Sequence, residues 1–261
     1  MEKLKWILIF TFLVKVSYAQ ENATHMLSEK IANQQTVGQQ TEAYYLQEIK
    51  SEPNNPRGYY NLGLYYSSLY QFNDAEVQYN KAIELDSNFG LAYTGLASLF
   101  LASGQMERAI AACELALTTD SLSAVNYLNM GVMQFQNMKF EEAEQSFLKG
   151  IQLDTMNSEL CLNMGTLLMQ INRQTEAIVY LKKALQINPN DPGSPYSLAS
   201  IFSSQEQIED GYTYLEMALK NGISFYDMLQ VDVTLSSLRK NMTRWKALMK
   251  KYFPKKIKLF F

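Results

Sequence analysis

The chain has 261 residues, of which 47% are hydrophobic and 19% charged, and it contains two cysteines and one histidine. This composition supports a sizeable hydrophobic core, which excludes an intrinsically disordered chain and a disulfide-stapled miniprotein. The formal net charge of −3 disfavours a dedicated nucleic-acid binder, because neutralising phosphates requires a basic surface. One histidine also leaves little for a multi-histidine metal site.

Residues 1–19 are predicted to be a secretory signal peptide. Two lysines form a basic start, residues 6–14 (WILIFTFLV) are continuously apolar, and Ser17 and Ala19 offer small residues before a cleavage site. The nine apolar residues are too few to cross a hydrocarbon core of about 30 Å, so an uncleaved membrane anchor is the weaker alternative. No cysteine follows the apolar run, so the pattern does not support a lipoprotein.

Charge is distributed unevenly along the predicted mature chain. Residues 20–238 contain 11 basic and 25 acidic residues, whereas residues 239–261 contain nine basic residues and no acidic one. This basic tail is compatible with contact to an anionic membrane surface, at about 1 kcal/mol per basic residue near that surface. It is equally compatible with a solvated cap that offsets the acidic body, and the sequence leaves both roles open.

A period of about 34 residues, a length typical of stacked helical repeats, organises the middle of the chain. Two columns of small residues and one bulky column recur at this spacing in five units without an insertion. The first small column is Ala75, Ala109, Ala143, Ala177 and Gly211, the bulky column is Tyr79, Cys113, Phe147, Leu181 and Leu215, and the second small column is Ala82, Ala116, Gly150, Ala184 and Ala218. Upstream, each unit pairs a large residue with a small one: Leu62-Gly63, Leu96-Ala97, Met130-Gly131, Met164-Gly165 and Leu198-Ala199.

Each unit is predicted to form a hairpin of two helices, because its apolar residues recur at helical intervals. Small residues where the helices cross allow close approach, and the bulky residues fill the space between them. Gly104 and Asn172 fall in the turns between the helices and tolerate a left-handed conformation. Each hairpin is followed by a turn with Asp or Asn, as at Asp86 and Asn188. No hairpin buries its apolar face alone, so the units must stack.

This pattern resembles the tetratricopeptide-repeat family, whose unit of this length carries an aromatic residue, Leu-Gly, Tyr, Ala, Phe, Ala and Pro at these offsets. The fit is best around Leu62-Gly63 and from Ala177 to Pro189. Pro195 and Gly211 depart from the pattern in the fifth unit, so we expect its first helix to begin late. The resemblance implies an all-α fold, a right-handed superhelical solenoid of stacked helical hairpins with a helical C-terminal cap. It also implies a non-enzymatic, protein-binding scaffold, here resembling exported bacterial members with an end-of-group extension.

The predicted organisation follows the period. After the signal peptide come a polar segment with a partial repeat helix (20–55), five repeat units (about 56–89, 90–123, 124–157, 158–191 and 192–222), a helical cap (223–253) and a basic and apolar tail (254–261). The segment after Gly222 abandons the period in sequence. Cap helices are expected near 225–231 and 241–253, with Leu229, Leu235, Leu238, Trp245 and Leu248 facing inward.

Nothing in the sequence indicates catalysis. His25 lies in the poorly patterned N-terminal segment and is interpreted as a surface residue. Cys113 and Cys161 fall in core columns and are predicted to be buried free thiols. Phosphate-binding glycine motifs are absent from the sequence, and acidic pairs at helix starts offset the helix dipole. We therefore predict no catalytic pair, no metal site and no cofactor.

The resemblance implies that the first helix of each unit lines a concave groove that touches an extended peptide. Asn61, Asn129 and Asn163 share one offset, so their amides are a candidate ladder for the backbone of a ligand, while ordinary consensus usage is the alternative. The other groove candidates are Tyr60, Thr94, Ser98, Leu128, Val132, Leu162, Thr166, Tyr196 and Ser200. None of these is basic, so the expected ligand is an apolar or hydrogen-bonding peptide of a protein partner.

Export implies the periplasm or cell envelope of a Gram-negative bacterium, or alternatively secretion. The rival function is an envelope-associated assembly factor that docks through the basic C-terminal tail, with possible membrane-surface contact through residues 239–261. A nucleic-acid partner is not expected, and the oligomeric state is left open.

Overall fold

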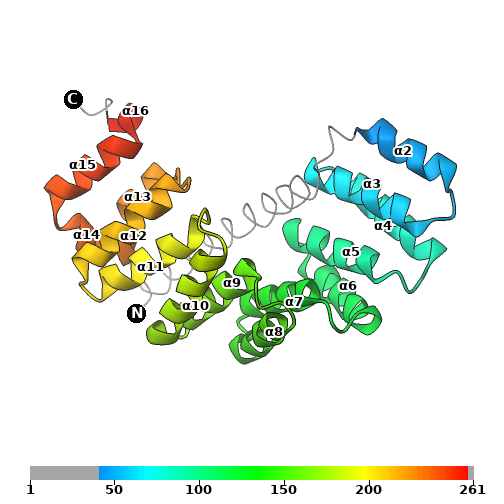
Figure 1. The fold of residues 1–261 in the computed structure, drawn as a ribbon, viewed down its shortest axis with the longest axis horizontal. Helices are drawn as coiled ribbons and strands as arrows, with labels where there is room; N and C mark the ends of the chain where they lie inside the picture. The colour runs from blue at the N-terminus through cyan, green and yellow to red at the C-terminus, as the bar shows by residue number, and fades with distance from the viewer. Residues whose placement is uncertain (1–40, 258–261) are drawn as a thin grey trace. The chain divides into compact units, whose positions relative to one another are not determined.

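The computed structural model describes residues 41–257, so the predicted signal peptide and the rest of the first 40 residues lie outside the described part. All regular elements in that part are helices, which confirms the prediction of an all-α fold (Figure 1). The chain divides into two compact units, with the boundary between Leu153 and Asp154.

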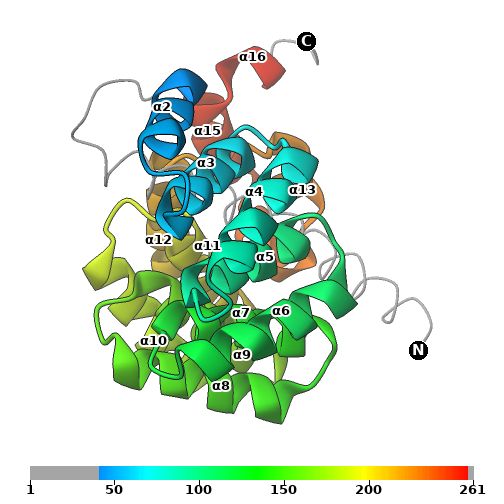
Figure 2. The same cartoon turned by 90° about the vertical axis from the view of Figure 1, so that its right-hand side faces the viewer.

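Unit 1 consists of a single helix followed by three helical hairpins. The single helix is α2 (Glu42–Ser51), and the hairpins pair α3 (Pro56–Ser68) with α4 (Phe72–Leu85), α5 (Gly90–Ala102) with α6 (Met106–Thr119), and α7 (Ala124–Gln136) with α8 (Phe140–Leu153). The first helices of these hairpins begin at Pro56, Gly90 and Ala124, which confirms the predicted period. Figure 2 shows α2 beside α3 at the start of the unit.

Unit 2 contains two further hairpins and a C-terminal group of short helices. The hairpins pair α9 (Ser158–Gln170) with α10 (Gln174–Ile187) and α11 (Gly193–Ser204) with α12 (Ile208–Lys220). The cap comprises α13 (Tyr226–Val231), the 3₁₀ turn η1 (Val233–Leu235), α14 (Ser236–Arg239), α15 (Met242–Tyr252) and α16 (Pro254–Ile257). The period would begin the first helix of the last hairpin at Pro192, but α11 begins at Gly193, slightly late, as Pro195 suggested.

Every hairpin turns through one residue in the left-handed conformation. These residues recur with the same period: Tyr70, Gly104, Met138, Asn172 and Glu206, with φ between 58° and 74°. The amide that follows each of them donates to the carbonyl five residues earlier, as in Gln105 to Phe100 at 2.8 Å. This bond closes the end of the first helix and directs the chain into the second.

Side chains also define where the first helices begin. Asn55, Ser123 and Asn157 accept hydrogen bonds from backbone amides of the first turn of α3, α7 and α9. In the connections between hairpins, a side chain accepts a hydrogen bond from the backbone amide two residues later. Asp86 Oδ1, for example, accepts from Asn88 N at 2.9 Å. Asp120, Asp154 and Asn188 make the same bond. Short polar side chains thus fix both ends of the connections.

The core of each hairpin is a large side chain set against a glycine or alanine of the first helix. Tyr79 lies against Gly63 and Phe147 against Gly131, and each glycine leaves no room for a side chain there. All five bulky-column residues, including Cys113, are at most 1% exposed. The alternation of large and small residues predicted from the sequence is therefore the packing that holds the helices together.

The cap helices begin where the period of the repeats would place them, although their residues no longer follow the small and bulky columns. Helix α13 begins two periods after α9, and α15 begins one period after α12, so they start where the two helices of a sixth hairpin would start. The segment thus abandons the period in its residues, as predicted, but keeps it in its helix starts. The cause is that stacking on α11 and α12 sets where the next helices lie, while the residues that fill them differ. Trp245 stands in the first small column and is 2% exposed.

The five cap residues expected to face inward are all buried, which confirms that prediction. They are Leu229, Leu235, Leu238, Trp245 and Leu248. The expected helix near 225–231 is present as α13, and the one near 241–253 as α15. The sequence did not predict the break between them, which occurs at Asp232, where the complete units carry leucine or methionine.

Candidate functional site

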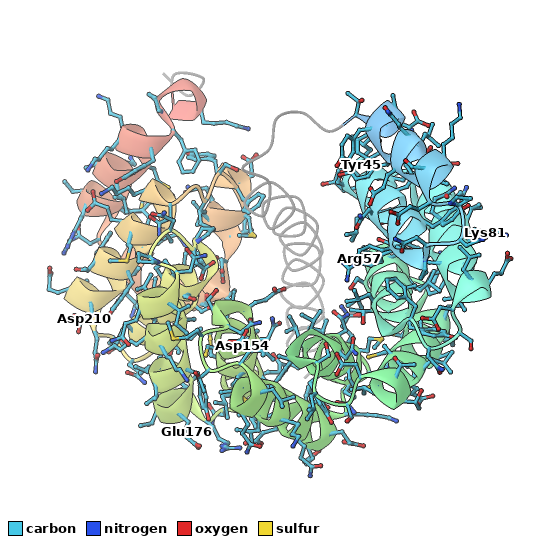
Figure 3. The ribbon with its side chains drawn as sticks, turned by 45° about the vertical axis from the view of Figure 1, so that its right-hand side comes forward. Tyr45, Arg57, Lys81, Asp154, Glu176 and Asp210 are labelled. Carbon is cyan, nitrogen blue, oxygen red and sulfur yellow. The ribbon has the colours of Figure 1, made fainter. Side chains whose placement is uncertain are left out.

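Each unit has a candidate binding surface, which is the face formed by the first helices of its own hairpins. The five first helices contain only two charged residues, Arg57 and Glu159, whereas the five second helices contain 18. In Figure 3, Arg57 and Lys81 lie on opposite sides of unit 1, on the first-helix and second-helix layers respectively. A wall that is almost free of charge favours an uncharged ligand, because burying a charge without a partner is costly.

Two predicted groove residues of α5 bind the next helix instead of facing solvent freely. Thr94 Oγ1 donates to Asn126 Oδ1 at 2.7 Å, and Asn129 Nδ2 donates to Ser98 Oγ at 3.0 Å. Asn126 and Asn129 belong to α7 and are nearly buried. The hydroxyl groups of α5 therefore connect adjacent first helices within unit 1.

The residues at the repeat positions of Thr94 and Ser98 also form hydrogen bonds at the end of unit 2, where they are Tyr196 and Ser200. Tyr196 donates to the carboxylate of Asp232, and Thr234 Oγ1 donates to Ser200 Oγ at 3.0 Å. Asp232 Oδ1 also accepts from the Thr234 amide at 2.8 Å. The structure thus places Tyr196 and Ser200 under the cap. Sequence reasoning missed this role, although the spacing of Ser200 and Thr234 by one period was a usable signal.

The three asparagines of the predicted ladder have different surroundings. In unit 1, Asn61 Nδ2 lies 3.5 Å from Glu48 Oε1 of α2, and Asn129 is only 8% exposed. In unit 2, Asn163 Nδ2 donates to the Glu159 carbonyl of its own helix at 2.9 Å. This bond of Asn163 to neighbouring backbone is the one expected if asparagine is only the usual residue of the repeat at this offset. The ladder itself stays a prediction.

The remaining candidates give the wall its apolar character. In unit 1, the ring of Tyr60 packs between Tyr79 and Phe89, with centroids 5.9 and 5.8 Å away. Burial raises the pKa of Tyr60, so its phenol is neutral at physiological pH. Val132 is half-buried, and Leu128 is 6% exposed.

In unit 2, Leu162 and Thr166 are half-buried on α9. Thr166 donates its hydroxyl to the Leu162 carbonyl at 3.0 Å. The hydroxyl group of Thr166 is thus hydrogen-bonded within its own helix, and its methyl group remains as the contact surface.

Both cysteines are buried free thiols, as predicted. Burial raises the pKa of Cys113 to about 12, and its Sγ lies 3.2 Å from the Asn126 carbonyl. A thiol in this state is not a nucleophile at neutral pH. Over residues 41–257, no group of three or more His, Cys, Asp or Glu side chains is placed to hold a metal ion. His25 lies outside the described residues.

Basic residues of the predicted tail pair with acidic residues of unit 2. The pairs are Lys240 with Glu206, Arg244 with Glu209, Lys251 with Glu216 and Lys256 with Asp227, at 2.5 to 3.2 Å. Arg244 also lies 4.0 Å above the ring of Tyr212. These contacts favour the cap that offsets acidic charge over membrane contact. Within the described part of the chain, no helix has the length and apolar character needed to cross a membrane.

Comparisons with known proteins agree with this architecture. One tetratricopeptide-repeat model matches residues 91–121 and 158–191, and a second matches residues 44–77. None of the curated proteins matches the chain in sequence.

Several solved structures share the fold. Pseudomonas aeruginosa pilF superposes with a TM-score of 0.67 and 23% identity, covering 78% of this chain and 94% of its own. YrrB, a TPR protein with an unusual peptide-binding site, gives 0.55 and 18%, covering 77% and 100%. A chain of the APC/C hetero-tetramer Cut9–Hcn1 gives 0.69 and 16%, covering 81% of this chain and 42% of its own. At these identities the likeness concerns the fold alone.

Proposed function

Because this chain belongs to the tetratricopeptide-repeat family, we propose that it is a protein-interaction scaffold whose first helices bind an uncharged, apolar segment of a partner protein. The observation that carries the proposal is the near absence of charge from the first helices. A preformed helical wall reduces the ordering cost of binding, which supports recognition by a rigid face. YrrB, with its peptide-binding site on the same fold, supports a peptide as the ligand.

The test adds a charge to a first helix, at a repeat position where another unit already carries a charged residue. Leu91 on α5 is 39% exposed and lies one repeat period after Arg57, so Leu91→Lys is compatible with the fold. Leu115→Lys on α6 is the matched control, because Leu115 is 48% exposed on a second helix. Partners are captured from an extract with residues 20–261 and quantified by mass spectrometry. A partner lost with Leu91→Lys and kept with Leu115→Lys supports the proposal, and equal retention by both variants contradicts it.

The proposal includes export to the cell envelope or beyond. It is supported by the basic start, the apolar run and the small residues of positions 1–19. The N-terminal sequence of the protein recovered from a cell fraction tests it. Cleavage before Gln20 supports export, and an intact Met1 in the cytosolic fraction contradicts it.

A further inference from the structure

The hairpin turns of unit 1 expose large apolar side chains at one edge of the unit. The left-handed residue of its first turn is Tyr70 and that of its third turn is Met138, and they are 59% and 65% exposed. Leu69, directly before Tyr70, is 49% exposed. Helix α5 packs on both α3 and α7, so the turn of the middle hairpin lies between the other two. We call these three turns the turn edge of unit 1.

Tyrosine and methionine are unfavourable residues for the two outer turns. A bulky side chain at positive φ is uncommon, because its Cβ atom crowds the next carbonyl oxygen, whereas glycine and asparagine adopt this conformation more readily. The chain has Gly104 and Asn172 at two equivalent turns. Tyr70 and Met138 add little to the core, since most of each side chain is exposed. Residues that cost stability without packing inside the protein are expected where another molecule contacts them.

A second set of apolar residues lies beside these turns. Two positions after each left-handed residue stand Phe72, Met106 and Phe140, which are half-buried. The ring of Phe72 lies edge-on to the ring of Tyr70, with centroids 6.1 Å apart. In the middle turn, Gly104 leaves an open position, because a Cβ atom placed there would meet no atom within 4 Å. The turn edge thus combines an apolar base, exposed side chains and an open position between them.

The apolar turns are a property of unit 1 and not a requirement of the hairpin fold. In unit 2 the left-handed residues are Asn172 and Glu206, which are polar. Gln174 stands two positions after Asn172, where unit 1 has Phe72, Met106 and Phe140. The hairpins of unit 2 therefore form the same turn with polar residues at positions where unit 1 presents apolar ones.

Carboxylates surround the turn edge. The segments that lead from each turn into the second helix, residues 69–76, 103–110 and 137–144, contain six acidic and two basic residues. Arg108, one of the two basic residues, is already paired with Glu76. Negative charge at a helix start offsets the helix dipole, and it also attracts the cationic groups of a ligand. Charge complementarity therefore favours a basic partner and disfavours an anionic membrane surface.

We propose that the turn edge of unit 1 is a docking site for a basic amphipathic segment of a partner protein. A large apolar side chain of that segment fills the position above Gly104 and contacts Tyr70 and Met138. Lysine or arginine side chains beside it pair with carboxylates at the starts of α4, α6 and α8. Tyrosine offers a large contact area with few rotatable bonds, and methionine adapts its shape to a ligand. The site differs from the wall of first helices, so it does not rest on the function proposed above.

The experiment measures binding and stability of the same variant. Fluorescent peptides built from Leu, Phe and Lys, with apolar residues at helical or at alternating spacing, are titrated with residues 20–261 and followed by anisotropy. We expect saturable binding, and no binding of matched peptides with Glu in place of Lys. Tyr70→Asn combined with Met138→Asn should weaken binding at least about tenfold. This double variant should be no less stable in urea, because asparagine tolerates the left-handed conformation, so unfolding would not explain the loss.

Two further variants separate the site from apolar surface in general. Leu122→Asn is the matched control, because Leu122 is 71% exposed in unit 1 but lies in the connection between α6 and α7. It should leave binding unchanged. Gly104→Asn should weaken binding, since it fills the open position with a residue that tolerates the φ of 74°.

The proposal is overturned by absence of saturable binding, by equal binding of the double variant, by equal affinity of the Lys and Glu peptides, or by an equal loss with Leu122→Asn. Two other measurements identify different occupants. Binding to phosphatidylglycerol vesicles that the double variant abolishes would assign the edge to a membrane surface. A dimer in sedimentation that the double variant dissociates would assign it to a second copy. Either result would also overturn the proposal.

Discussion

A Cβ atom at Gly131 would lie 2.5 Å from Cε1 of Phe147, so the ring of Phe147 rests directly on the backbone of α7. The size of the bulky residue is matched by the residue that it contacts. Tyr79, Phe147 and Leu181 face Gly63, Gly131 and Gly165, whereas the smaller Cys113 shares its unit with Ala97. The two aromatic rings thus each face a glycine, whereas leucine is paired with Gly165 in the fourth hairpin and with Ala199 in the fifth.

Gly131→Ala is therefore expected to destabilise the protein. Alanine is the better helix former by about 1 kcal/mol, but forcing a methyl group against the ring costs about 1–3 kcal/mol. We expect a lower urea midpoint with an unchanged m-value. The control is the same substitution in a Phe147→Leu background, following the pairing of Ala199 with Leu215 in the fifth hairpin. Equal cost in both backgrounds would mean that the ring is not the cause.

The period and the columns predicted the hairpins because the same contacts recur in every unit. The left-handed turns were predicted only at Gly104 and Asn172, since nothing in Tyr70, Met138 or Glu206 signals that conformation. At these three positions the closing hydrogen bonds of the first helix impose it. The predicted groove was less accurate at Thr94 and Ser98, because the partners of a hydroxyl depend on how neighbouring helices stack.

Relieving the backbone strain at Met138 should stabilise unit 1. Met138 is 65% exposed with φ of 60°, so Met138→Asn sacrifices little contact and is expected to gain about 0.5–1 kcal/mol. Gly104→Ala is the opposite control, because no atom lies within 4 Å of its added Cβ and only the φ of 74° opposes it. It should cost about 1 kcal/mol. Urea midpoints that move in the same direction would contradict this account.

The buried Asn129 of the predicted ladder should affect stability more than the half-buried Asn61. Asn129→Ala removes the donor to Ser98 inside unit 1, and we expect a loss of about 1–2 kcal/mol. Asn61→Ala breaks only a long contact with Glu48 and should cost less than about 0.5 kcal/mol. Binding experiments on the ladder must therefore use Asn61→Ala first. A larger loss for Asn61→Ala would reverse this assignment.

Asp232 is expected to hold the cap on α11. Asp232→Ala leaves the Tyr196 hydroxyl and the Thr234 amide without their acceptor, which should cost about 2–3 kcal/mol. Trp245 reports on this directly, because the only other tryptophan is Trp6 in the predicted signal peptide. Asp227→Ala is the matched control, since it breaks only an exposed ion pair with Lys256. Trp245 fluorescence should show earlier unfolding in urea for Asp232→Ala alone.

The cap should also lose stability in acid. Hydrogen bonds from Arg244 and Lys251 lower the pKa of Glu209 and of Glu216. Because the pKa of each folded carboxyl lies below its unfolded value of about 4.3, the stabilisation is present above that value. It is lost as the pH falls through the folded pKa. The urea midpoint of Trp245 fluorescence should therefore drop as the pH falls below the unfolded value of about 4.3.

Glu209→Gln combined with Glu216→Gln should flatten that pH dependence, because the amides do not titrate. High salt should flatten it as well, since both ion pairs are exposed and screening weakens them. Glu141→Gln combined with Glu142→Gln on α8 is the control, because it removes the same number of carboxylates without touching the cap. If the control pair flattens the profile as much as the cap pair, general charge repulsion rather than the two ion pairs explains the acid sensitivity.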